Sequence, residues 1–171
     1  MSAELGHSPI VKSLCWPNEI ATQLFAGALA AQPALQQAFI ELHGDLGAGK
    51  TTLVRHLLRA LGVQGRIKSP TYAVVEPYEL PDLMIWHFDF YRFNDPREWE
   101  DAGFRDIFAS PGLKLAEWPE KAIGVLPRAD LVIYLETTDS EARQVTLSAQ
   151  TETGVALLQA ANPGISHKGQ A

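Results

Sequence analysis

The stretch GDLGAGKTT, residues 44–52, combines the residue types that bind phosphate groups in proteins. Gly44, Gly49, Lys50 and Thr51 complete the pattern G-x-x-x-x-G-K-[ST]. The glycines let successive backbone N–H groups turn toward an anion. The lysine reaches the β- and γ-phosphates, and the threonine hydroxyl is a hard oxygen ligand for Mg²⁺. The pattern therefore predicts a nucleoside triphosphate site, contacted by Asp45, Leu46, Gly47, Ala48, Gly49, Lys50, Thr51 and Thr52.

Two carboxylates stand where phosphoryl transfer needs them, to hold the metal and orient the nucleophile. Asp89 closes the apolar run WHFDFYR, at the place of a Walker B carboxylate, and Glu117 ends LKLAE. Both runs have the composition of strands, so we expect both acids at the carboxyl edge of a sheet, where open α/β sheets bind ligands. For each of them, a solvated carboxylate at a strand end is the alternative.

The segment KSPTY, residues 68–72, lies between the helix after the glycine loop and the next strand. GTPases place a switch threonine in such a segment to sense the γ-phosphate through Mg²⁺, and Thr71 fits that position, although a plain turn at Pro70 is equally compatible with the spacing. His87 and Asp89 share a face, but no third zinc ligand is near, so we expect His87 to pack or to form a hydrogen bond. An N-K-x-D guanine-reading motif is absent, which leaves ATP as the expected nucleotide.

The elements around the glycine loop follow from apolar spacing. Residues 17–32 predict a helix with Asn18 as N-cap and with Ile20, Leu24 and Ala28 on one stripe. Residues 38–43, AFIELH, predict a buried strand that ends at the glycines. From Lys50 the leucines recur at helical spacing as far as Gly62, a typical helix stop. The loop therefore connects a strand to a helix.

The rest of the chain predicts further strands and helices. We expect strands over 71–78 and 83–91, joined by a turn at 81–82, then a short helix over 94–103, strands over 113–117, 130–136 and 143–149, and a terminal helix over 151–160. This alternation favours a three-layer α/β domain with a mainly parallel sheet and antiparallel additions. We expect one domain over 1–159 and a flexible tail over 160–171.

Composition limits the classes of protein to which the chain can belong. The net charge of −6 is unlike that of a protein that grips nucleic acid unaided, so a role on tRNA or DNA is expected to run through a partner protein. No apolar run approaches the roughly 20 residues of a membrane span, and the N-terminus lacks a signal-peptide pattern. Cys15 is the single cysteine; we expect a buried structural thiol and a reducing cytoplasm.

Several blocks together resemble the TsaE family, also called YjeE. They are GDLGAGKTT, SPTY at 69–72, VEPY at 75–78, HFDFYR at 87–92 and EWPE at 117–120, within a match over about 38–128. The combination of SPT, HxDxYR and EWP is far more specific than the glycine loop alone. The ends, 1–15 and 150–171, match no motif of the family.

The resemblance implies a P-loop NTPase fold and a small ATPase that uses ATP and Mg²⁺. Members are needed to make threonylcarbamoyladenosine, the modified adenosine beside the anticodon of tRNA. The resemblance also implies two protein partners, TsaB and TsaD, with the tRNA reached indirectly through that complex, and slow hydrolysis by the subunit alone. The acidic net charge agrees with this division of labour.

The same resemblance assigns roles residue by residue. Lys50 and Thr51 correspond to the phosphate and Mg²⁺ contacts, and Glu117 to a glutamate associated with magnesium. Asp89 corresponds to the aspartate of HxDxYR, expected to orient water or the water shell of the metal, and Thr71 to the threonine of SPT. Trp118 corresponds to the tryptophan of EWP, near the nucleotide or the partner surface, with core packing as the alternative. Glu19, at the start of the first helix, corresponds less securely to a nucleotide-proximal acidic position.

Two other functions remain compatible with a phosphate-binding loop. A small-molecule kinase usually carries a basic lid, but Arg92, Arg97 and Arg105 are scattered rather than clustered. A nucleotide-gated binding module would not need the acids at 89 and 117. The sequence does not assign an arginine finger; Arg92 is the best candidate in cis, and a structural ion pair is equally compatible with its position.

Overall fold

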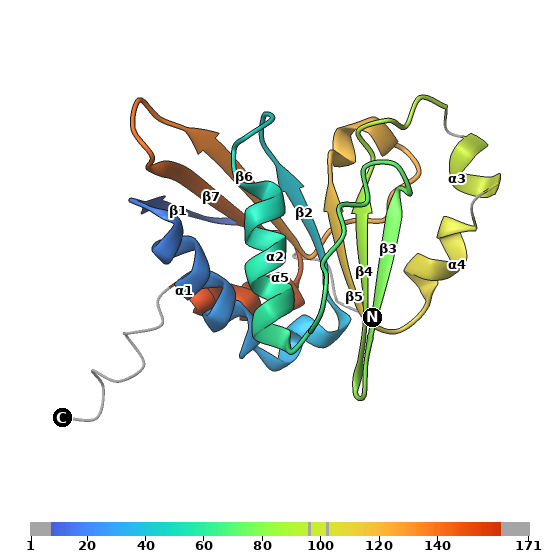
Figure 1. The fold of residues 1–171 in the computed structure, drawn as a ribbon, viewed down its shortest axis with the longest axis horizontal. Helices are drawn as coiled ribbons and strands as arrows, with labels where there is room; N and C mark the ends of the chain where they lie inside the picture. The colour runs from blue at the N-terminus through green and yellow to red at the C-terminus, as the bar shows by residue number, and fades with distance from the viewer. Residues whose placement is uncertain (1–7, 96, 102, 162–171) are drawn as a thin grey trace.

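The computed structural model describes residues 8–95, 97–101 and 103–161 (Figure 1). The strands are β1 Ile10–Trp16, β2 Phe39–His43, β3 Val75–Leu80, β4 Leu83–Asp89, β5 Leu113–Glu117, β6 Leu131–Thr137 and β7 Arg143–Ala149. They form one sheet in the order β1-β7-β6-β2-β5-β4-β3. The central strands β6, β2, β5 and β4 pair in parallel, and the outer pairings are antiparallel. The predicted α/β class, with a mainly parallel sheet and antiparallel additions, is confirmed.

Helices cover both faces of this sheet (Figure 1). One face carries α1 (Glu19–Ala30), α2 (Lys50–Leu61) and α5 (Glu152–Leu157), and the other carries α3 (Arg97–Asp101) and α4 (Phe104–Ala109). Short 3-10 segments complete the connections: η1 Pro33–Gln37, η2 Pro119–Ala122 and η3 Leu158–Ala161. The three predicted layers are therefore present.

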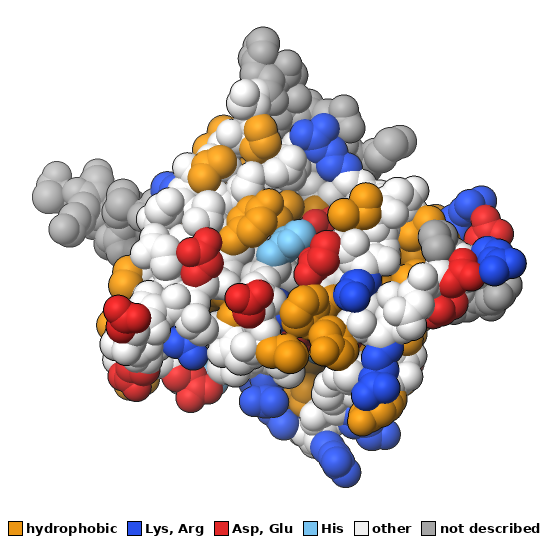
Figure 2. Space-filling model, turned by 90° about the horizontal axis from the view of Figure 1, so that it is seen from above, with side chains coloured by type: hydrophobic (Ala, Val, Ile, Leu, Met, Phe, Trp, Pro, Cys, Tyr) orange, Lys and Arg blue, Asp and Glu red, His pale blue; other side chains and the backbone are white. Residues whose placement is uncertain are grey.

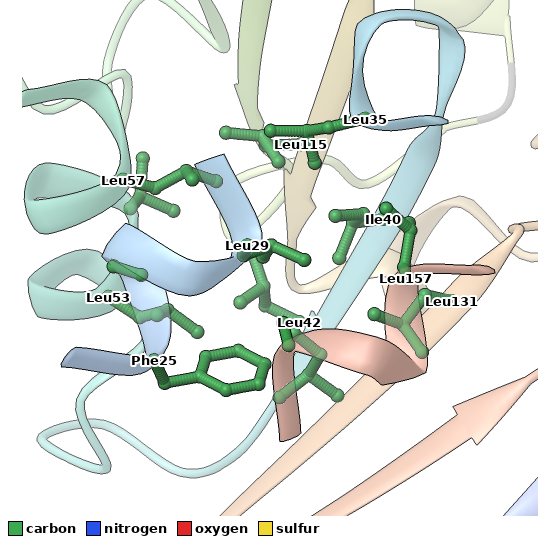
Figure 3. Packing of buried hydrophobic residues seen from close by; sticks show 14 of the residues in the cluster. Phe25, Leu29, Leu35, Ile40, Leu42, Leu53, Leu57, Leu115, Leu131 and Leu157 are labelled. Atoms are coloured by element: carbon green, nitrogen blue, oxygen red, sulfur yellow. The ribbon is translucent and has the colours of Figure 1, made fainter. Parts of the chain in front are cut away.

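The alternation of side chains along β2 divides the core in two. Ile40 and Leu42 point toward α1, α2 and α5, where Figure 3 shows them among leucines from these helices. Phe39 points to the opposite face and joins an aromatic cluster that includes Phe88 and Phe104. Strands at the centre of a parallel sheet are buried on both faces, which explains why the run before the glycine loop is almost entirely apolar.

Asp130 anchors the starts of three elements. Its carboxylate accepts hydrogen bonds from the Phe39 N–H at 2.8 Å and from the Thr151 hydroxyl at 2.7 Å. Thr151 in turn is the N-cap of α5 and accepts from the Gly154 N–H. A buried carboxylate is stable only when donors satisfy it, so this group fixes β2, β6 and α5 relative to one another.

Several predicted boundaries were wrong. The strand predicted over 71–78 begins only at Val75, because residues 71–74 form a turn in which the Val74 N–H bonds to the Pro70 carbonyl. The helix predicted over 94–103 is observed as the shorter α3, and α4 was not predicted. The edge strand β1 was missed as well, because no motif or turn signal marks it.

Two predictions about burial were also wrong. The buried stripe of α1 is Thr22, Phe25, Ala26 and Leu29, whereas Ile20 and Leu24 are 64% and 68% exposed. The helix has two apolar stripes, and the one that carries the aromatic ring packs on the sheet. Cys15 is exposed rather than buried, because on β1 the alternate residues Leu14 and Trp16 turn toward the core.

Some predictions fall on residues that the structure does not describe. The helix expected over 151–160 is observed as α5 and η3, but the tail beyond Ala161, the first seven residues and Pro96, where a helix was expected to open, lie outside the described residues. No helix among the described residues is long and apolar enough to cross a membrane.

The close approach of α5 to the sheet predicts that Gly154→Ala destabilises the protein. A Cβ at Gly154 would overlap the backbone carbonyl of Asp130, so we expect a loss of about 1–3 kcal/mol in the free energy of unfolding, as for other overpacked sites. Gly27→Ala in α1 is the matched control, because nothing lies within 4 Å of its added Cβ and alanine favours helix by about 0.5–1 kcal/mol. Urea unfolding followed by circular dichroism measures both, and equal stabilities would contradict the prediction.

Candidate nucleotide-binding site

The glycine loop, residues 44–49, connects the end of β2 to the start of α2. Gly49 is the N-cap of α2 with φ of +109°, a conformation that side chains disfavour. Gly44 is needed for space, because an added Cβ would lie 2.6 Å from the Leu135 carbonyl oxygen. The loop thus brings the start of a 12-residue helix to the carboxyl edge of the sheet, where unpaired N–H groups and the helix dipole favour anions.

The Lys50 side chain is folded back into this loop and is only 5% exposed. Its ammonium donates to the carbonyls of Gly44 and Asp45 and lies 3.9 Å from the centroid of the Trp118 ring. Burial lowers the pKa of Lys50, and the negative charges of Glu117, Glu120, Asp89 and Asp45 oppose that shift. A positive charge is therefore held inside the loop by groups that a phosphate could replace.

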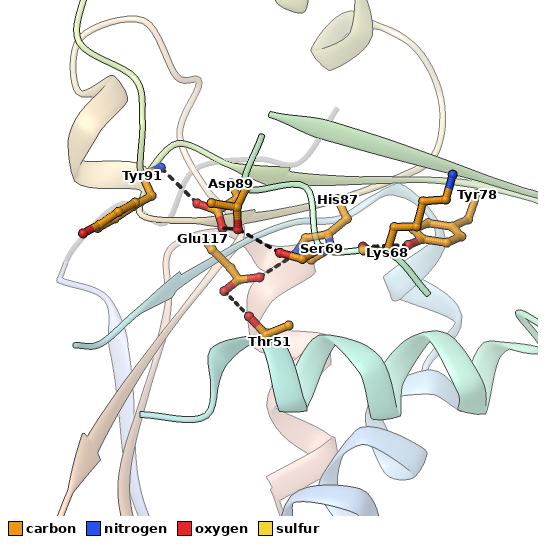
Figure 4. A network of polar contacts seen from close by, with 9 residues as sticks. Thr51, Lys68, Ser69, Tyr78, His87, Asp89, Tyr91 and Glu117 are labelled. Atoms are coloured by element: carbon orange, nitrogen blue, oxygen red, sulfur yellow. Dashed lines mark hydrogen bonds and ion pairs between the residues drawn. The ribbon is translucent and has the colours of Figure 1, made fainter. Parts of the chain in front are cut away.

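Glu117 joins α2 to the sheet. Its carboxylate, at the end of β5, accepts a hydrogen bond from the Thr51 hydroxyl at 2.9 Å and contacts His87 Nε2 at 2.6 Å (Figure 4). Because an ionised carboxylate only accepts, Nε2 is the protonated nitrogen, and His87 Nδ1 has no hydrogen-bond partner among the described residues. The hydrogen bond expected for His87 is present, and it fixes the orientation of Glu117, which is 2% exposed.

Asp89 lies beside Glu117 because the two residues are register partners on the parallel strands β4 and β5. Its carboxylate accepts from the Tyr91 N–H at 2.9 Å and from the Thr71 hydroxyl at 3.3 Å. Burial raises the pKa of Asp89; the Tyr91 hydrogen bond opposes this, and the charge of Glu117 reinforces it. Thr71 itself is held by Ser69, whose hydroxyl is 2.8 Å away.

A cavity of about 530 Å³ runs along the glycine loop, and every residue predicted for the site lines it. The lining thus includes Glu19, Asp45, Leu46, Gly47, Ala48, Gly49, Lys50, Thr51, Thr52, Thr71, Asp89, Glu117 and Trp118. Residues from five segments of the chain therefore meet at one place. Their individual roles toward a nucleotide stay predictions.

The sequence prediction missed other residues that line the cavity: Trp16, Asn18, Thr22, Tyr91, Leu135, Glu141 and Arg143. Arg143, at the start of β7, donates to the Ala48 carbonyl at 3.0 Å and to the Gly47 carbonyl at 3.4 Å, so it braces the loop from the far side. No local motif marks it. Tyr91 packs against Trp118 with ring centroids 5.0 Å apart; its place in HFDFYR was the available signal.

The raised pKa of Asp89 predicts that Asp89→Asn stabilises the ligand-free protein at neutral pH. A carboxyl whose pKa is raised on folding contributes stability below its unfolded pKa, about 3.9, and that contribution is lost as pH rises through the folded pKa. The neutral amide avoids this loss, so we expect a higher thermal midpoint than the wild type at pH 7 and a smaller difference near pH 4.

The control is Asp82→Asn in the exposed turn between β3 and β4. Its thermal midpoint should differ from that of the wild type by the same amount at both pH values. Thermal unfolding without metal or nucleotide measures these midpoints. A lower midpoint for Asp89→Asn at pH 7 would contradict the assignment of a burial cost to this carboxylate.

Comparisons with known proteins show the family of this chain and agree with its fold. A sequence model described as threonylcarbamoyl adenosine biosynthesis protein TsaE matches residues 16–145. The tRNA threonylcarbamoyladenosine biosynthesis protein TsaE of Haemophilus influenzae is 45% identical over 136 residues, 80% of this chain and 85% of that protein. The protein of the same name from Bacillus subtilis is 34% identical over 110 residues, 64% of this chain and 68% of that protein.

A solved structure is similar over nearly the whole fold. The crystal structure of Bacillus subtilis YdiB matches with a TM-score of 0.74 and 26% sequence identity, over 90% of this chain and 95% of that one. The family match covers the glycine loop, both carboxylates and the start of β7. By these criteria the chain belongs to the TsaE family of tRNA threonylcarbamoyladenosine biosynthesis proteins.

Proposed function

We propose that this chain serves tRNA threonylcarbamoyladenosine biosynthesis as a Mg²⁺-dependent ATPase that acts in the cytoplasm with TsaB and TsaD proteins. Membership of the family gives the pathway. The observation that carries the ATPase proposal is that the Lys50 ammonium, the Thr51 hydroxyl and the carboxylates of Asp89 and Glu117 line one cavity. The glycine loop lines the same cavity. These are the groups that position a triphosphate, a metal and a nucleophile in phosphoryl transfer.

The residues present fit a magnesium ion. The Thr51 hydroxyl and the Glu117 carboxylate are hard oxygen donors 2.9 Å apart, and Mg²⁺ typically uses one or two protein oxygens and fills its remaining positions with phosphates and water. No group of three or more His, Cys, Asp or Glu side chains suited to a metal occurs among the described residues. When bound, the ion would neutralise charge on the β- and γ-phosphate oxygens.

The other polar groups have separate tasks in this proposal. The Lys50 ammonium leaves the loop carbonyls and the Trp118 ring and contacts phosphate oxygens instead. There its positive charge stabilises the β- and γ-phosphates. Asp89, whose raised pKa suits a group that accepts a proton, orients the attacking water. Thr71, hydrogen-bonded to Asp89, links the segment 68–74 to the state of the γ-phosphate.

An exposed apolar surface beside the cavity supports a protein partner. Ile20 and Leu24, one turn apart on α1, and Leu46, in the glycine loop, are 64%, 68% and 71% exposed. Exposed apolar side chains that gather at a functional site are typical of protein contacts. Leu46 lines the cavity, and Ile20 and Leu24 lie on the helix that also carries the lining residues Glu19 and Thr22, so a partner bound there would respond to the nucleotide.

Phosphate release from ATP by the purified protein tests the proposal. We expect slow Mg²⁺-dependent turnover that changes when the TsaB–TsaD pair is added. Asp89→Ala should reduce turnover about 10²–10⁴-fold while ATP still binds, and Asp82→Ala in the exposed turn is the control. The proposal is contradicted if adding the TsaB–TsaD pair changes neither the rate of ATP turnover nor the binding of ATP.

The same experiment separates the two alternative functions. If Asp89→Ala abolishes hydrolysis but supports full tRNA modification, the chain is a nucleotide-gated binding module. If ADP appears in step with a phosphorylated metabolite, the chain is a small-molecule kinase.

The contact between His87 and Glu117 predicts that two substitutions of His87 differ in their effect on metal affinity. His87→Ala removes the donor and leaves the buried carboxylate with one partner, so Mn²⁺ affinity in the presence of a non-hydrolysable ATP analogue should fall about tenfold or more. His87→Gln places an amide donor near the position of Nε2 and should retain most of the affinity. Calorimetric titration measures both; unchanged affinity in His87→Ala would refute a positioning role.

A further inference from the structure

One segment of this acidic protein carries basic residues and no acidic ones. Residues 46–75 contain five Lys or Arg and no Asp or Glu, although the chain as a whole has 14 basic and 20 acidic residues. All the acidic residues therefore lie outside this segment, which consists of the glycine loop from Leu46 onward, α2 and the connection to β3. Net charge alone hides this asymmetry.

The structure places four of these cations at the surface of α2 and the segment after it. Arg55 and Arg59 lie one turn apart on the exposed side of α2, and Arg66 and Lys68 are exposed in the following connection. Arg59 donates to the carbonyls of Val63 and Gly65, so the connection is fixed against the helix. Figure 2, which looks onto the edge bearing the glycine loop, shows several basic side chains along the lower border of that face, with acidic ones also at its lower left.

An aromatic ring extends this surface toward the cavity. Tyr72 is 81% exposed, and the guanidinium of Arg92 lies 4.2 Å from the centroid of its ring. A surface cation–π pair accounts for about 0.5–1 kcal/mol and does not explain why a large ring stands free in water. An exposed aromatic face backed by an arginine is, however, a typical platform for stacking a nucleic-acid base.

We infer that Arg55, Arg59, Arg66, Lys68, Tyr72 and Arg92, here called the α2 basic face, bind RNA directly. The four cations of α2 and its connection contact phosphates, and Tyr72 stacks on an unpaired base. The inference goes beyond the proposed function, in which tRNA is reached only through the partner proteins. It also replaces the exclusion based on net charge, because phosphate contacts depend on local rather than total charge.

An acidic protein surface would pair with the charges, whereas RNA pairs with the charges and also stacks an unpaired base on the exposed ring. RNA uses both, and the pathway of the family acts on a tRNA. The position of Tyr72 next to Thr71, which lines the cavity, places the proposed base contact beside the nucleotide site.

Fluorescence anisotropy with a labelled, unmodified tRNA transcript tests the inference on the full chain without nucleotide, so that the result does not depend on ATP hydrolysis. We expect binding that weakens with salt, as phosphate contacts require. Arg55→Ala/Arg66→Ala should weaken binding about tenfold and reduce the slope against log salt by about 2. Tyr72→Ala should weaken binding about tenfold at an unchanged slope, because stacking releases no counterion.

The matched control is Arg97→Ala/Arg105→Ala, which removes two exposed charges from α3 and α4 on the opposite face of the sheet. It should leave both affinity and slope unchanged. The inference is overturned if no binding is seen at about 100 μM protein and low salt, or if the control loses as much affinity as the test variants. It is overturned as well if the α2 basic face proves necessary only for binding the TsaB–TsaD pair.

Discussion

The hydrogen bond between Thr51 and Glu117 is the constraint on which the site depends. It joins the first turn of α2 to the end of β5, so the helix that carries the glycine loop and the strand that carries the acid are held in one geometry. The groups around it are charged and buried, which is costly unless each is paired. Lys50 is paired with loop carbonyls, and Glu117 with Thr51 and His87. The acidic part of the site is preorganised, because two partners already hold the Glu117 carboxylate in the ligand-free chain.

Strand pairing and core packing away from the site hold this geometry in place. Asp89 and Glu117 are neighbours because β4 and β5 are parallel and in register, and the register is kept by a core that is buried on both faces of the sheet. The antiparallel return of β7 brings Arg143 back to the loop, where it holds the Ala48 carbonyl. In the proposed function stability and activity compete at Asp89, since burial beside a second carboxylate suits a proton acceptor but opposes folding at neutral pH.

Short sequence motifs predicted those site residues that lie within a motif. The glycine loop, the two strand-end acids and Thr71 carry their own spacing, and the structure gathers them in one cavity. Arg143 could not be found, because its place follows from strand pairing with no motif to mark it. The apolar stripe of α1 was assigned to the wrong side because Ile20 and Leu24 have core-like periodicity but face solvent. Cys15 was misplaced because β1, which sets its direction, was not predicted.

A crystal structure with Mg²⁺ and a non-hydrolysable ATP analogue tests the central claim most directly. The account predicts a triphosphate inside the glycine loop, the Lys50 ammonium moved from the Trp118 ring to phosphate oxygens, and a metal held by the oxygens of Thr51 and Glu117. An empty loop in crystals grown with saturating analogue would contradict it, and so would a nucleotide bound with the carboxylates of Asp89 and Glu117 turned away from the phosphates.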